Sequence, residues 1–399
     1  MTTPHILLIN VFFAPFSYGG ATVVAEQVAK ALVQQHGCRI TAISAISRTD
    51  LVPYCVTRSE KDGIQNFLIN LPPHRQYSEI YNNPRVTEII AGLLEQLAPD
   101  LLHAHCIQDL GAGFLEVAAQ LGIPTVLSLH DFWWVCDRQF MIKPDQSYCH
   151  QNPIDFEVCK GCVDNVSAAR LRRSYVQAQA LHADLVTYPS RFAKDLCEAS
   201  GFAVGKGVVW ENGVNLPAAD FFDRQAQRRA DDPRISFGFL GGPSQMKGWP
   251  TIRRAFSDIR QQDFKGYLVD GSLDGTWWKN IEISALKGDW EVFPRFDQEN
   301  LDDFYSRIDV LLFLSQWKET FGLAIREAVS RGILVIQTDS GGTVEHAQSR
   351  PENLIAIGAS PNVLRQRLEH LLDEGLPQTP AMAVTDIAEQ SRRFLALIA

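Results

Sequence analysis

Two glutamates, Glu319 and Glu327, stand eight residues apart in the segment 316–330, QWKETFGLAIREAVS. The apolar run at residues 309–314 predicts a strand before it, and a helix is predicted to begin near Phe321 or Gly322. The first backbone N–H groups of such a helix, with the positive end of its dipole, form an anion site. The residues that would supply it are Thr320, Phe321, Gly322 and Leu323. Glu319 could then accept hydrogen bonds from ligand hydroxyls, and Glu327, two helical turns on, from a diol. The alternative is one glutamate that compensates the helix dipole and one exposed helix glutamate.

A second candidate for phosphate binding is Lys247, in the loop LGGPSQMKG that follows a predicted strand at residues 235–240. A lysine there could neutralise the charge of a departing diphosphate. The order Lys247-Gly248, without a following Ser or Thr, excludes a P-loop. An ordinary surface lysine is the alternative.

The first half of the chain has candidates after two predicted strands. Gly19-Gly20 follows the strand at residues 5–11 and either borders a ligand or only makes a tight turn. Because the pattern G-x-G-x-x-G is missing, a dinucleotide-dependent dehydrogenase is disfavoured. His130 ends the strand at residues 125–129 and is the stronger histidine candidate, with Asp131 beside it. His103 and His105, at the end of the previous strand, are weaker candidates. Phe132, Trp133 and Trp134 follow Asp131; their aromatic faces suit a sugar, but at least one of the tryptophans is expected in the core.

Short β-branched runs alternate with amphipathic segments, which is typical of α/β folding with parallel sheets. In the first half, strands are predicted at residues 5–11, 39–43, 101–105, 125–129, 184–188 and 208–210, and helices at 21–36, 85–97, 109–121, 166–182 and 191–200. Residues 220–233 are charged and indicate a linker or an exposed helix. A second series follows, with strands at 235–240, 266–269, 309–314 and 333–337, and a last helix at 386–398. The restart predicts two Rossmann-like units, whose ligands bind at the carboxyl ends of the strands.

The composition excludes some classes of function. The formal net charge of −9 argues against a nucleic-acid-binding protein. No apolar run approaches the ~18 residues that cross a bilayer, and the first residues do not resemble a signal peptide. The protein is therefore expected to be cytoplasmic, with contact at the inner face of the plasma membrane left open.

Four of the 8 cysteines, Cys136, Cys149, Cys159 and Cys162, are spaced C-x12-C-x9-C-x2-C. A C-x2-C turn that contains a glycine can aim two sulfur atoms at one metal ion. A structural zinc site is the leading interpretation, because a cytoplasmic protein seldom forms disulfides and the intervening loop has little core of its own. Free thiols and disulfides are the alternatives.

The second-half motif E-T-F-G-L-x3-E-A, which begins at Glu319 and continues through Gly332 and the Asp339–Gly342 turn to Glu345, resembles the signature of glycosyltransferase family 4. This resemblance implies an α/β fold of GT-B architecture, with two facing Rossmann-like domains, a deep cleft between them and a C-terminal helix that crosses back. The predicted domains are residues 1–215 for the acceptor, with a cysteine-rich insertion at 136–162, and 216–380 for the nucleotide-sugar donor. Residues 381–399 would pack back on the first domain.

The resemblance also implies roles for the candidate residues. Glu319 would contact the transferred sugar, Glu327 the ribose and His130 the hydroxyls of the donor sugar, while Lys247 would hold the diphosphate. The glycine loop at Gly19 and Gly20 would border the donor phosphate and the acceptor. The sequence departs from the family pattern at Gly242, where the family has an arginine. Either Lys247 and the backbone amides are enough to bind the diphosphate, or an arginine from another loop, such as Arg295, contributes to the site.

The function implied is a retaining hexosyltransferase that uses a UDP-sugar or GDP-sugar and a glycan or polyprenyl-linked oligosaccharide acceptor, in bacterial exo-, capsular or O-polysaccharide assembly. No Asp-x-Asp triplet occurs, so a metal-independent reaction without a catalytic cofactor is expected. The alternatives are a sugar-nucleotide epimerase or hydrolase on the same fold, and a non-catalytic subunit that binds a sugar nucleotide.

Overall fold

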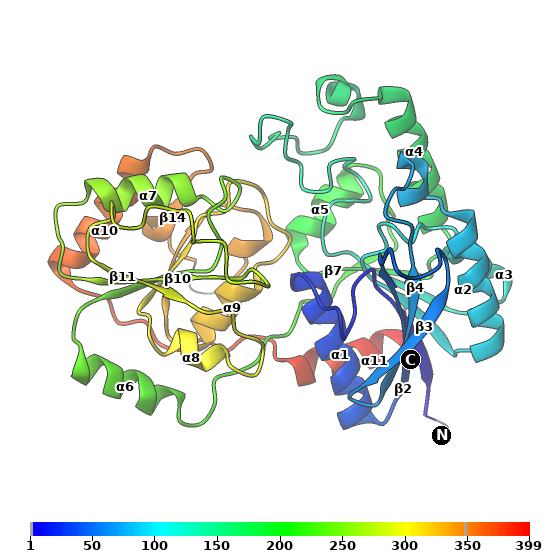
Figure 1. Cartoon of the computed structure of the whole chain (residues 1–399), viewed down its shortest axis with the longest axis horizontal. Helices are drawn as coiled ribbons and strands as arrows, with labels where there is room; N and C mark the ends of the chain where they lie inside the picture. Colours follow the sequence, from blue (N-terminus) through cyan, green and yellow to red (C-terminus); the bar gives the residue numbers. More distant parts are fainter. Residues whose placement is uncertain (1–2, 347–348) are drawn as a thin grey trace. The chain divides into compact units, whose positions relative to one another are not determined.

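The protein, described here by a computed structural model of residues 3–346 and 349–399, divides into two compact units (Figure 1). Unit 1 comprises Met1–Met141, His150–Gly213 and Thr385–Ala399, and unit 2 comprises Ile142–Cys149 and Val214–Val384. Each unit is built on one mostly or wholly parallel sheet with helices along it. No helix of the described residues is long and apolar enough to span a bilayer.

Unit 1 has an 8-stranded sheet in the order β3-β4-β2-β1-β5-β6-β7-β8, parallel except at β3. Its strands are β1 (His5–Ile9), β2 (Arg39–Ile46), β3 (Val56–Lys61), β4 (Ile64–Asn70), β5 (Leu101–Ala104), β6 (Thr125–Ser128), β7 (Leu185–Tyr188) and β8 (Gly207–Val209). Its α-helices are α1 (Gly20–His36), α2 (Pro84–Leu97), α3 (Phe114–Gln120), α4 (Val166–Ala180), α5 (Arg191–Ala199) and α11 (Ile387–Ile398). Apart from β3 and β8, the order is that of a doubly wound Rossmann sheet.

The C-terminal helix α11 belongs to unit 1 and packs on α1, the red and blue helices of Figure 1. The amide of Gly213 donates to Gln390 Oε1 at 2.7 Å, and the ring nitrogen of Trp210 donates to the Gln390 carbonyl at 3.0 Å. A Cβ on Gly213 would lie 2.4 Å from the carbonyl oxygen of Asp386, so this close approach requires glycine. The end of the chain is thereby fixed to unit 1 although its sequence follows unit 2.

Two local features of unit 1 differ from the prediction. The helix expected at residues 109–121 begins only at Phe114, because Asp109 and Gly111 have φ angles of 71° and 79° that a helix cannot contain. The antiparallel hairpin of β3 and β4 was not predicted at all. Its signal is the pair Asp62-Gly63, both at positive φ, a dipeptide that favours a tight hairpin turn.

Unit 2 has a 6-stranded parallel sheet in the order β11-β10-β9-β12-β13-β14, the order of a doubly wound Rossmann sheet. Its strands are β9 (Ser236–Phe239), β10 (Lys265–Val269), β11 (Asp289–Phe293), β12 (Val310–Phe313), β13 (Leu334–Thr338) and β14 (Leu354–Ile355). Its α-helices are α6 (Phe221–Asp231), α7 (Trp249–Asp258), α8 (Leu301–Tyr305), α9 (Leu323–Ser330) and α10 (Pro361–Glu374). The charged segment at residues 220–233 is therefore helix α6.

Side chains that alternate along the strands of unit 2 fill two separate cores. Leu312 and Ile336 belong to a core that includes residues of α7 and α10, whereas Leu311 and Val335 belong to one with residues of α8 and α9. A parallel sheet covered on both faces needs such near-continuous apolar strands. The strand order reverses between β9 and β12, so the loops at their carboxyl ends form the switch point at which ligands bind in such folds.

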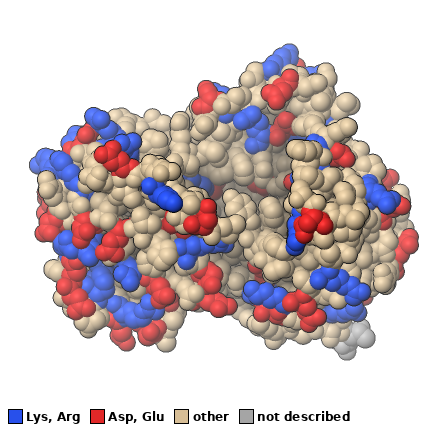
Figure 2. Space-filling model, viewed as in Figure 1, with Lys and Arg blue, Asp and Glu red and all other residues tan. Residues whose placement is uncertain are grey.

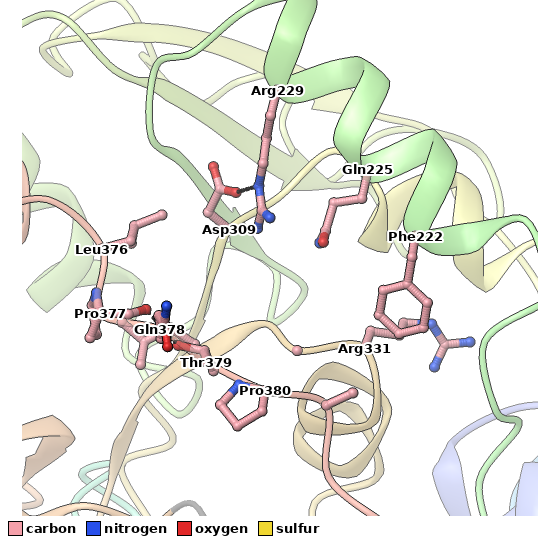
Figure 3. Close-up of a pocket in the computed structure, with 13 residues that line it drawn as sticks. Phe222, Gln225, Arg229, Asp309, Arg331, Leu376, Pro377, Gln378, Thr379 and Pro380 are labelled. Atoms are coloured by element: carbon pink, nitrogen blue, oxygen red, sulfur yellow. Dashed lines mark hydrogen bonds and ion pairs between the residues drawn. The ribbon is translucent and has the colours of Figure 1, made fainter.

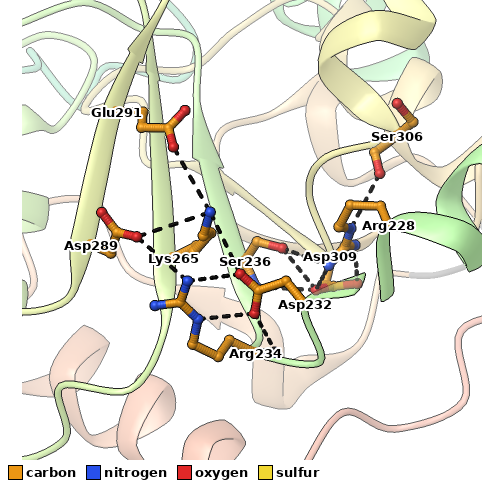
Figure 4. Close-up of polar contacts among 9 residues, drawn as sticks. All are labelled: Arg228, Asp232, Arg234, Ser236, Lys265, Asp289, Glu291, Ser306 and Asp309. Atoms are coloured by element: carbon orange, nitrogen blue, oxygen red, sulfur yellow. Dashed lines mark hydrogen bonds and ion pairs between the residues drawn. The ribbon is translucent and has the colours of Figure 1, made fainter. Parts of the chain in front are cut away.

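The opposite, amino edge of this sheet is held by a network of ion pairs (Figure 4). Arg228 binds Asp309 through both Nη nitrogens, at 3.0 and 2.7 Å, and Asp309 also accepts from Ser236. Arg234 binds Asp232 at 2.7 Å and Asp289 at 3.4 Å. These bonds fix the starts of β9, β11 and β12, whereas ligands bind at the opposite, carboxyl edge in such folds.

Candidate functional site

The loops after β9 and β12 meet at the switch point of unit 2. The amide of Gln316 donates to the carbonyl of Met246 at 2.7 Å. Gly248 has a φ of +81°, and a Cβ there would lie 2.2 Å from the carbonyl oxygen of Leu314. Only glycine permits this approach, which brings Lys247 on one loop to Glu319 on the other.

Glu319 is the centre of a polar cluster. Its Oε1 accepts from Lys247 Nζ at 2.7 Å, from Ser315 Oγ at 2.5 Å and from the Trp317 ring nitrogen at 2.7 Å. Burial raises the pKa of Glu319, but the Lys247 ammonium and the other two donors outweigh it, so the pKa lies below its usual value of 4.5. Glu319 is therefore ionised at neutral pH, and the three bonds converge on only one of its oxygens.

The backbone of Glu319 is fixed by the turn that follows β13. Its amide donates to the carbonyl of Ser340 at 2.9 Å, and its carbonyl accepts from the amide of Gly342 at 2.9 Å. Ser315 and Trp317 were not predicted as site residues. A tryptophan two residues before a glutamate, in a loop between strand and helix, is the signal that could have indicated them.

Arg326 connects the Glu319 loop to the turn after β13, and it was also not predicted as a site residue. Its guanidinium is buried and donates to the carbonyls of Phe321, Gly342, Thr343 and Glu345 at 2.7 to 3.0 Å. Its carbon Cζ lies 4.2 Å from the centre of the Phe321 ring. The charged pair Arg326-Glu327 inside the otherwise apolar helix stretch AIREAV is the sequence signal for such buried polar groups.

Helix α9 begins at Leu323, directly after the Glu319 loop. Its N-cap residue is Gly322, with a φ of 87° and no side chain to cap the helix. Because Gly322 has no side chain and the first turn contains no acidic residue, no side chain caps this helix end, whose positive dipole faces the loop of Glu319. Thr320 is half-buried and Phe321 is buried.

Glu327 does not lie on an exposed helix face. It is 5% exposed, its Oε2 accepts from the Tyr305 hydroxyl at 2.8 Å, and its backbone carbonyl accepts from Arg331 at 3.0 Å. Burial raises the pKa of Glu327, against the effects of the Tyr305 bond and the Arg331 charge. This excludes the exposed-helix alternative for Glu327.

The missing arginine has a steric reason. Gly242 has a φ of +67°, and a Cβ there would lie 2.7 Å from the ring of Trp277. Trp277 therefore occupies the space in which a side chain at position 242 would begin. Arg295 is exposed on the loop after β11, and within the described residues no hydrogen bond or ion pair joins it to Lys247 or Glu319. The structure thus does not bring Arg295 into the cluster.

The predicted histidine of unit 1 belongs to a row of three histidines at the carboxyl ends of β5 and β6. His130 Nε2 and His105 Nδ1 are 2.8 Å apart, and His103 Nε2 is 2.8 Å from Ser128 Oγ. Burial lowers the pKa of His103 to about 3 and that of His130 to about 4, so both are neutral at pH 7.

The tautomers of His105 and His130 follow from hydrogen-bond satisfaction. His105 is 1% exposed and its Nε2 has no partner among the described atoms. A buried lone pair without a partner costs less free energy than a buried N–H without one. His105 is therefore assigned its proton on Nδ1, from which it donates a hydrogen bond to His130 Nε2. A neutral His130 then carries its own proton on Nδ1. That atom therefore cannot act as a base.

Other candidates of unit 1 have structural contacts. Gly19 is the N-cap of α1 with a φ of 83°, and Gly20 is its first residue. Asp131 accepts from the Trp133 amide at 2.8 Å and from Gln139 at 2.6 Å and so fixes the turn after β6. The aromatic residues of this turn, Phe132, Trp133 and Trp134, are all buried in the core.

The four-cysteine zinc site stays a prediction. Among the residues that the structure describes, no group of three or more His, Cys, Asp or Glu side chains is placed to hold a metal ion. Cys149 belongs to unit 2 and the other three to unit 1. The thiol of Cys159, in the C-x2-C turn, donates to the carbonyl of Asp155 at 3.8 Å and accepts from Gln151 at 3.7 Å. These contacts use Cys159 as a weak hydrogen-bonding group.

Sequence comparisons agree with the class of protein that these sites suggest. The model of "Glycosyltransferase Family 4" matches residues 18–217, and that of "Glycosyl transferases group 1" matches residues 220–387. A 42.6 kDa protein described as uncharacterised, from the cps region of Klebsiella pneumoniae, is 20% identical over 371 residues, 87% of this chain and 88% of that protein. A glycosyltransferase of Methanocaldococcus jannaschii, also described as uncharacterised, is 21% identical over 318 residues, 79% of this chain and 77% of that one.

Solved structures share the fold. Sucrose-phosphate synthase of Thermosynechococcus elongatus matches with a TM-score of 0.65 at 18% identity, over 99% of this chain and 94% of that one. Anabaena HepE, solved with UDP and glucose, matches with a TM-score of 0.64 at 16% identity, over 98% of both chains. The two parallel-sheet units therefore have the GT-B architecture. The chain belongs to glycosyltransferase family 4, and both the predicted family and the predicted fold class are confirmed.

Proposed function

We propose that this glycosyltransferase moves a hexose, with retention of configuration and without a metal ion, from a nucleotide-diphosphate sugar to a glycan or lipid-linked acceptor. The observation that carries the proposal is the Lys247–Glu319 pair at the switch point of unit 2. A cation and an ionised carboxylate at 2.7 Å, beside an uncapped helix end, suit a ligand that has both phosphates and hydroxyl groups. A role in polysaccharide assembly is supported by the cps-region relative.

In this mechanism the negative charge that develops on the leaving diphosphate is stabilised by Lys247 and the N-terminus of α9, with the backbone amides of Thr320, Phe321, Gly322 and Leu323. The Nζ of Lys247 lies 5.0 Å from the centre of the Trp317 ring, and this cation–π contact positions the lysine before the ligand binds. Position 242 cannot supply a second cation there, which gives Lys247 a larger share of this task than an arginine–lysine pair would leave it.

Glu319 is proposed to accept hydrogen bonds from the hydroxyl groups of the sugar through Oε2, since Oε1 already has three donors. Glu327 is proposed to bind the ribose diol and Arg295 to approach the donor. In unit 1, Gly19 and Gly20 are proposed to border the phosphate. His130 is proposed to contact the hydroxyl groups of the donor sugar. The proposed location is cytoplasmic, at the inner face of the plasma membrane when the acceptor is lipid-linked.

The experiment begins with a thermal-shift panel of UDP- and GDP-sugars, because a donor that binds only the folded state stabilises it more the further its concentration exceeds its Kd. Transfer from the preferred donor is then measured for wild type, Glu319→Gln and the control Glu352→Gln, whose exposed side chain lies in the 3-10 turn Pro351–Asn353. We expect a loss of about 10²–10³ in kcat for Glu319→Gln and none for the control.

Three readouts test the finer parts of the proposal. Retention requires that the anomeric configuration of the donor persists in the product, as read by NMR. Metal independence requires that EDTA leaves turnover unchanged. Nucleotide release without any acceptor would indicate a hydrolase or epimerase instead, and donor binding without turnover would indicate a non-catalytic subunit.

A further inference from the structure

Trp317 contacts both members of the Lys247–Glu319 pair. Over the face that Figure 2 shows, Lys and Arg side chains are interspersed with Asp and Glu, which is usual for a protein surface. Exposed ion pairs of that kind have little effect on stability. The Lys247–Glu319 pair differs from them because a buried aromatic ring lies against it. Trp317 is 8% exposed, its ring nitrogen donates to Glu319 Oε1 at 2.7 Å, and the centre of its ring lies 5.0 Å from Lys247 Nζ.

These two contacts use different parts of the indole. The face of the ring attracts the ammonium of Lys247, and the N–H at its edge binds the carboxylate of Glu319. An indole N–H can only donate, and a donor stabilises an ionised carboxylate more than a neutral carboxyl group. Trp317 therefore favours both the negative charge of Glu319 and the position of Lys247.

A diphosphate bound beside Lys247 would change the surroundings of Glu319. Burial raises the pKa of Glu319, and the Lys247 ammonium is the charge that opposes this effect most strongly. A diphosphate would attract the same ammonium and bring further negative charge near the carboxylate, and both effects raise the pKa of the carboxylate. Glu319 would then become protonated at a higher pH, at the stage when its free oxygen has to bind a sugar.

Two donors to Glu319 do not depend on Lys247, and they are Ser315 Oγ and the Trp317 ring nitrogen. The serine hydroxyl can rotate, and it can accept a hydrogen bond as well as donate one. The indole N–H belongs to a rigid, buried ring that has no acceptor of its own. Of the two, Trp317 is therefore the donor whose direction is fixed when the charges around Glu319 change.

We propose that Trp317 is a positioning residue, which keeps Glu319 ionised and leaves its Oε2 for the sugar while the Lys247 ammonium is drawn from Glu319 toward the diphosphate of the donor. The cation–π contact gives Lys247 its position in the empty site, and the N–H bond holds Glu319 once the lysine is shared with the phosphates. The inference rests on the proposed function, because it requires a diphosphate at Lys247 and a sugar at Glu319.

The first test counts the protons that the full chain takes up when it binds UDP or GDP, whichever stabilises it more. The method is titration calorimetry at about pH 5.5 in two buffers of different ionisation enthalpy. Trp317→Phe keeps an aromatic ring at this position and removes the N–H. We expect this variant to take up about 0.3 proton more per site than wild type, because Glu319 loses a donor that stabilises its charge. In a Glu319→Gln background the same replacement should not change the proton uptake.

The second test is the pH dependence of kcat and KM with the preferred donor. Trp317→Phe should retain kcat within about threefold at pH 8, and the acid limb of its kcat profile should move up by about one pH unit, the size expected for a hydrogen bond to a charged group. Trp317→Leu removes the ring as well. It should also raise the KM for the donor about threefold or more, because Lys247 loses its cation–π contact.

Two matched controls remove the same groups elsewhere in unit 2. Trp290→Phe removes an indole N–H that donates to the Lys287 carbonyl at 2.7 Å. Phe222→Leu removes an aromatic ring that lines a cavity between α6 and the segment from Leu376 to Ala381, at the amino edge of the sheet (Figure 3). Neither control should change the proton uptake or the acid limb.

The inference is overturned if Trp317→Phe leaves either the proton uptake or the acid limb as in wild type, or if it lowers kcat equally at every pH, as a purely structural defect would. A control that shifts the acid limb as much as Trp317→Phe also overturns it. Wild-type turnover by Glu319→Gln, or no binding of either nucleotide, would refute the proposed function itself, and this inference with it.

Discussion

Replacement of Lys247 by methionine tests whether the charge of Lys247 is what keeps Glu319 ionised. Two unit charges about 4 Å apart attract by about 4 kcal/mol at an effective dielectric constant of 20. The Lys247 side chain is 34% exposed and that of Glu319 is 16% exposed, so water screens part of this attraction. We therefore expect Lys247→Met to lower the free energy of unfolding by about 2 kcal/mol at pH 7.

The stability difference between wild type and Lys247→Met should depend on pH. In wild type the pKa of Glu319 is depressed, so its contribution to stability is present above pH 4.5 and is lost as pH falls through the folded-state pKa. Without Lys247 the charge that opposes burial most strongly is lost, so the pKa of Glu319 should rise above its value in wild type. The carboxylate then destabilises the variant at pH 7, and protonation relieves this. The difference between wild type and variant should shrink toward pH 4.

The assay is urea unfolding of both proteins between pH 4 and pH 8, with a midpoint shift of about 1 M expected at pH 7. Addition of Glu319→Gln to the Lys247→Met variant should restore about half of the loss, since the uncompensated charge is gone. The control is Lys318→Met, because Lys318 pairs at 3.3 Å with an aspartate that is 59% exposed and should cost less than about 1 kcal/mol. A loss that does not change with pH, or a double variant no more stable than the single one, would refute the reasoning.

Three further changes test the frame of the site and the histidine row. Arg326→Met leaves four carbonyls without their buried donor and should cost about 3–5 kcal/mol in urea unfolding; a loss under 1 kcal/mol contradicts the scaffold role. Gly248→Ala should lower the thermal midpoint more than Gly275→Ala, because both have positive φ but only Gly248 lacks space for a Cβ, and equal shifts would argue against the close approach. Burial lowers the pKa of His130 to about 4 from 6.5, so the unfolded state binds more protons between these values, and stability should fall by up to about 3 kcal/mol as pH drops from 6.5 to 4. A His130→Asn variant should lose that share of the pH dependence, and an unchanged slope would contradict it.

Much of the fold could be predicted because its signals are local. The apolar strands and amphipathic helices of both halves recur in series, and the change from unit 1 to unit 2, between Gly213 and Val214, lies shortly before the charged segment at residues 220–233. The helix predicted at residues 109–121 was wrong in its start, since helical periodicity does not reveal the left-handed residues Asp109 and Gly111. The hairpin of β3 and β4 was missed because its Asp62-Gly63 turn is a short signal within a polar stretch.

The sequence by itself determined the family and the identity of the residues that could do chemistry, because Glu319, Lys247 and His130 each follow a strand, and the end of a parallel strand is where such folds bind ligands. Only the tertiary structure shows which groups bind and position these residues. Ser315 and Trp317 donate to Glu319, Tyr305 binds Glu327, and Trp277 closes position 242 to any side chain. The bond between Tyr305 and Glu327, which are 22 residues apart, and the contact of Trp277 with Gly242 depend on how distant segments pack, and no local pattern of residue types encodes that.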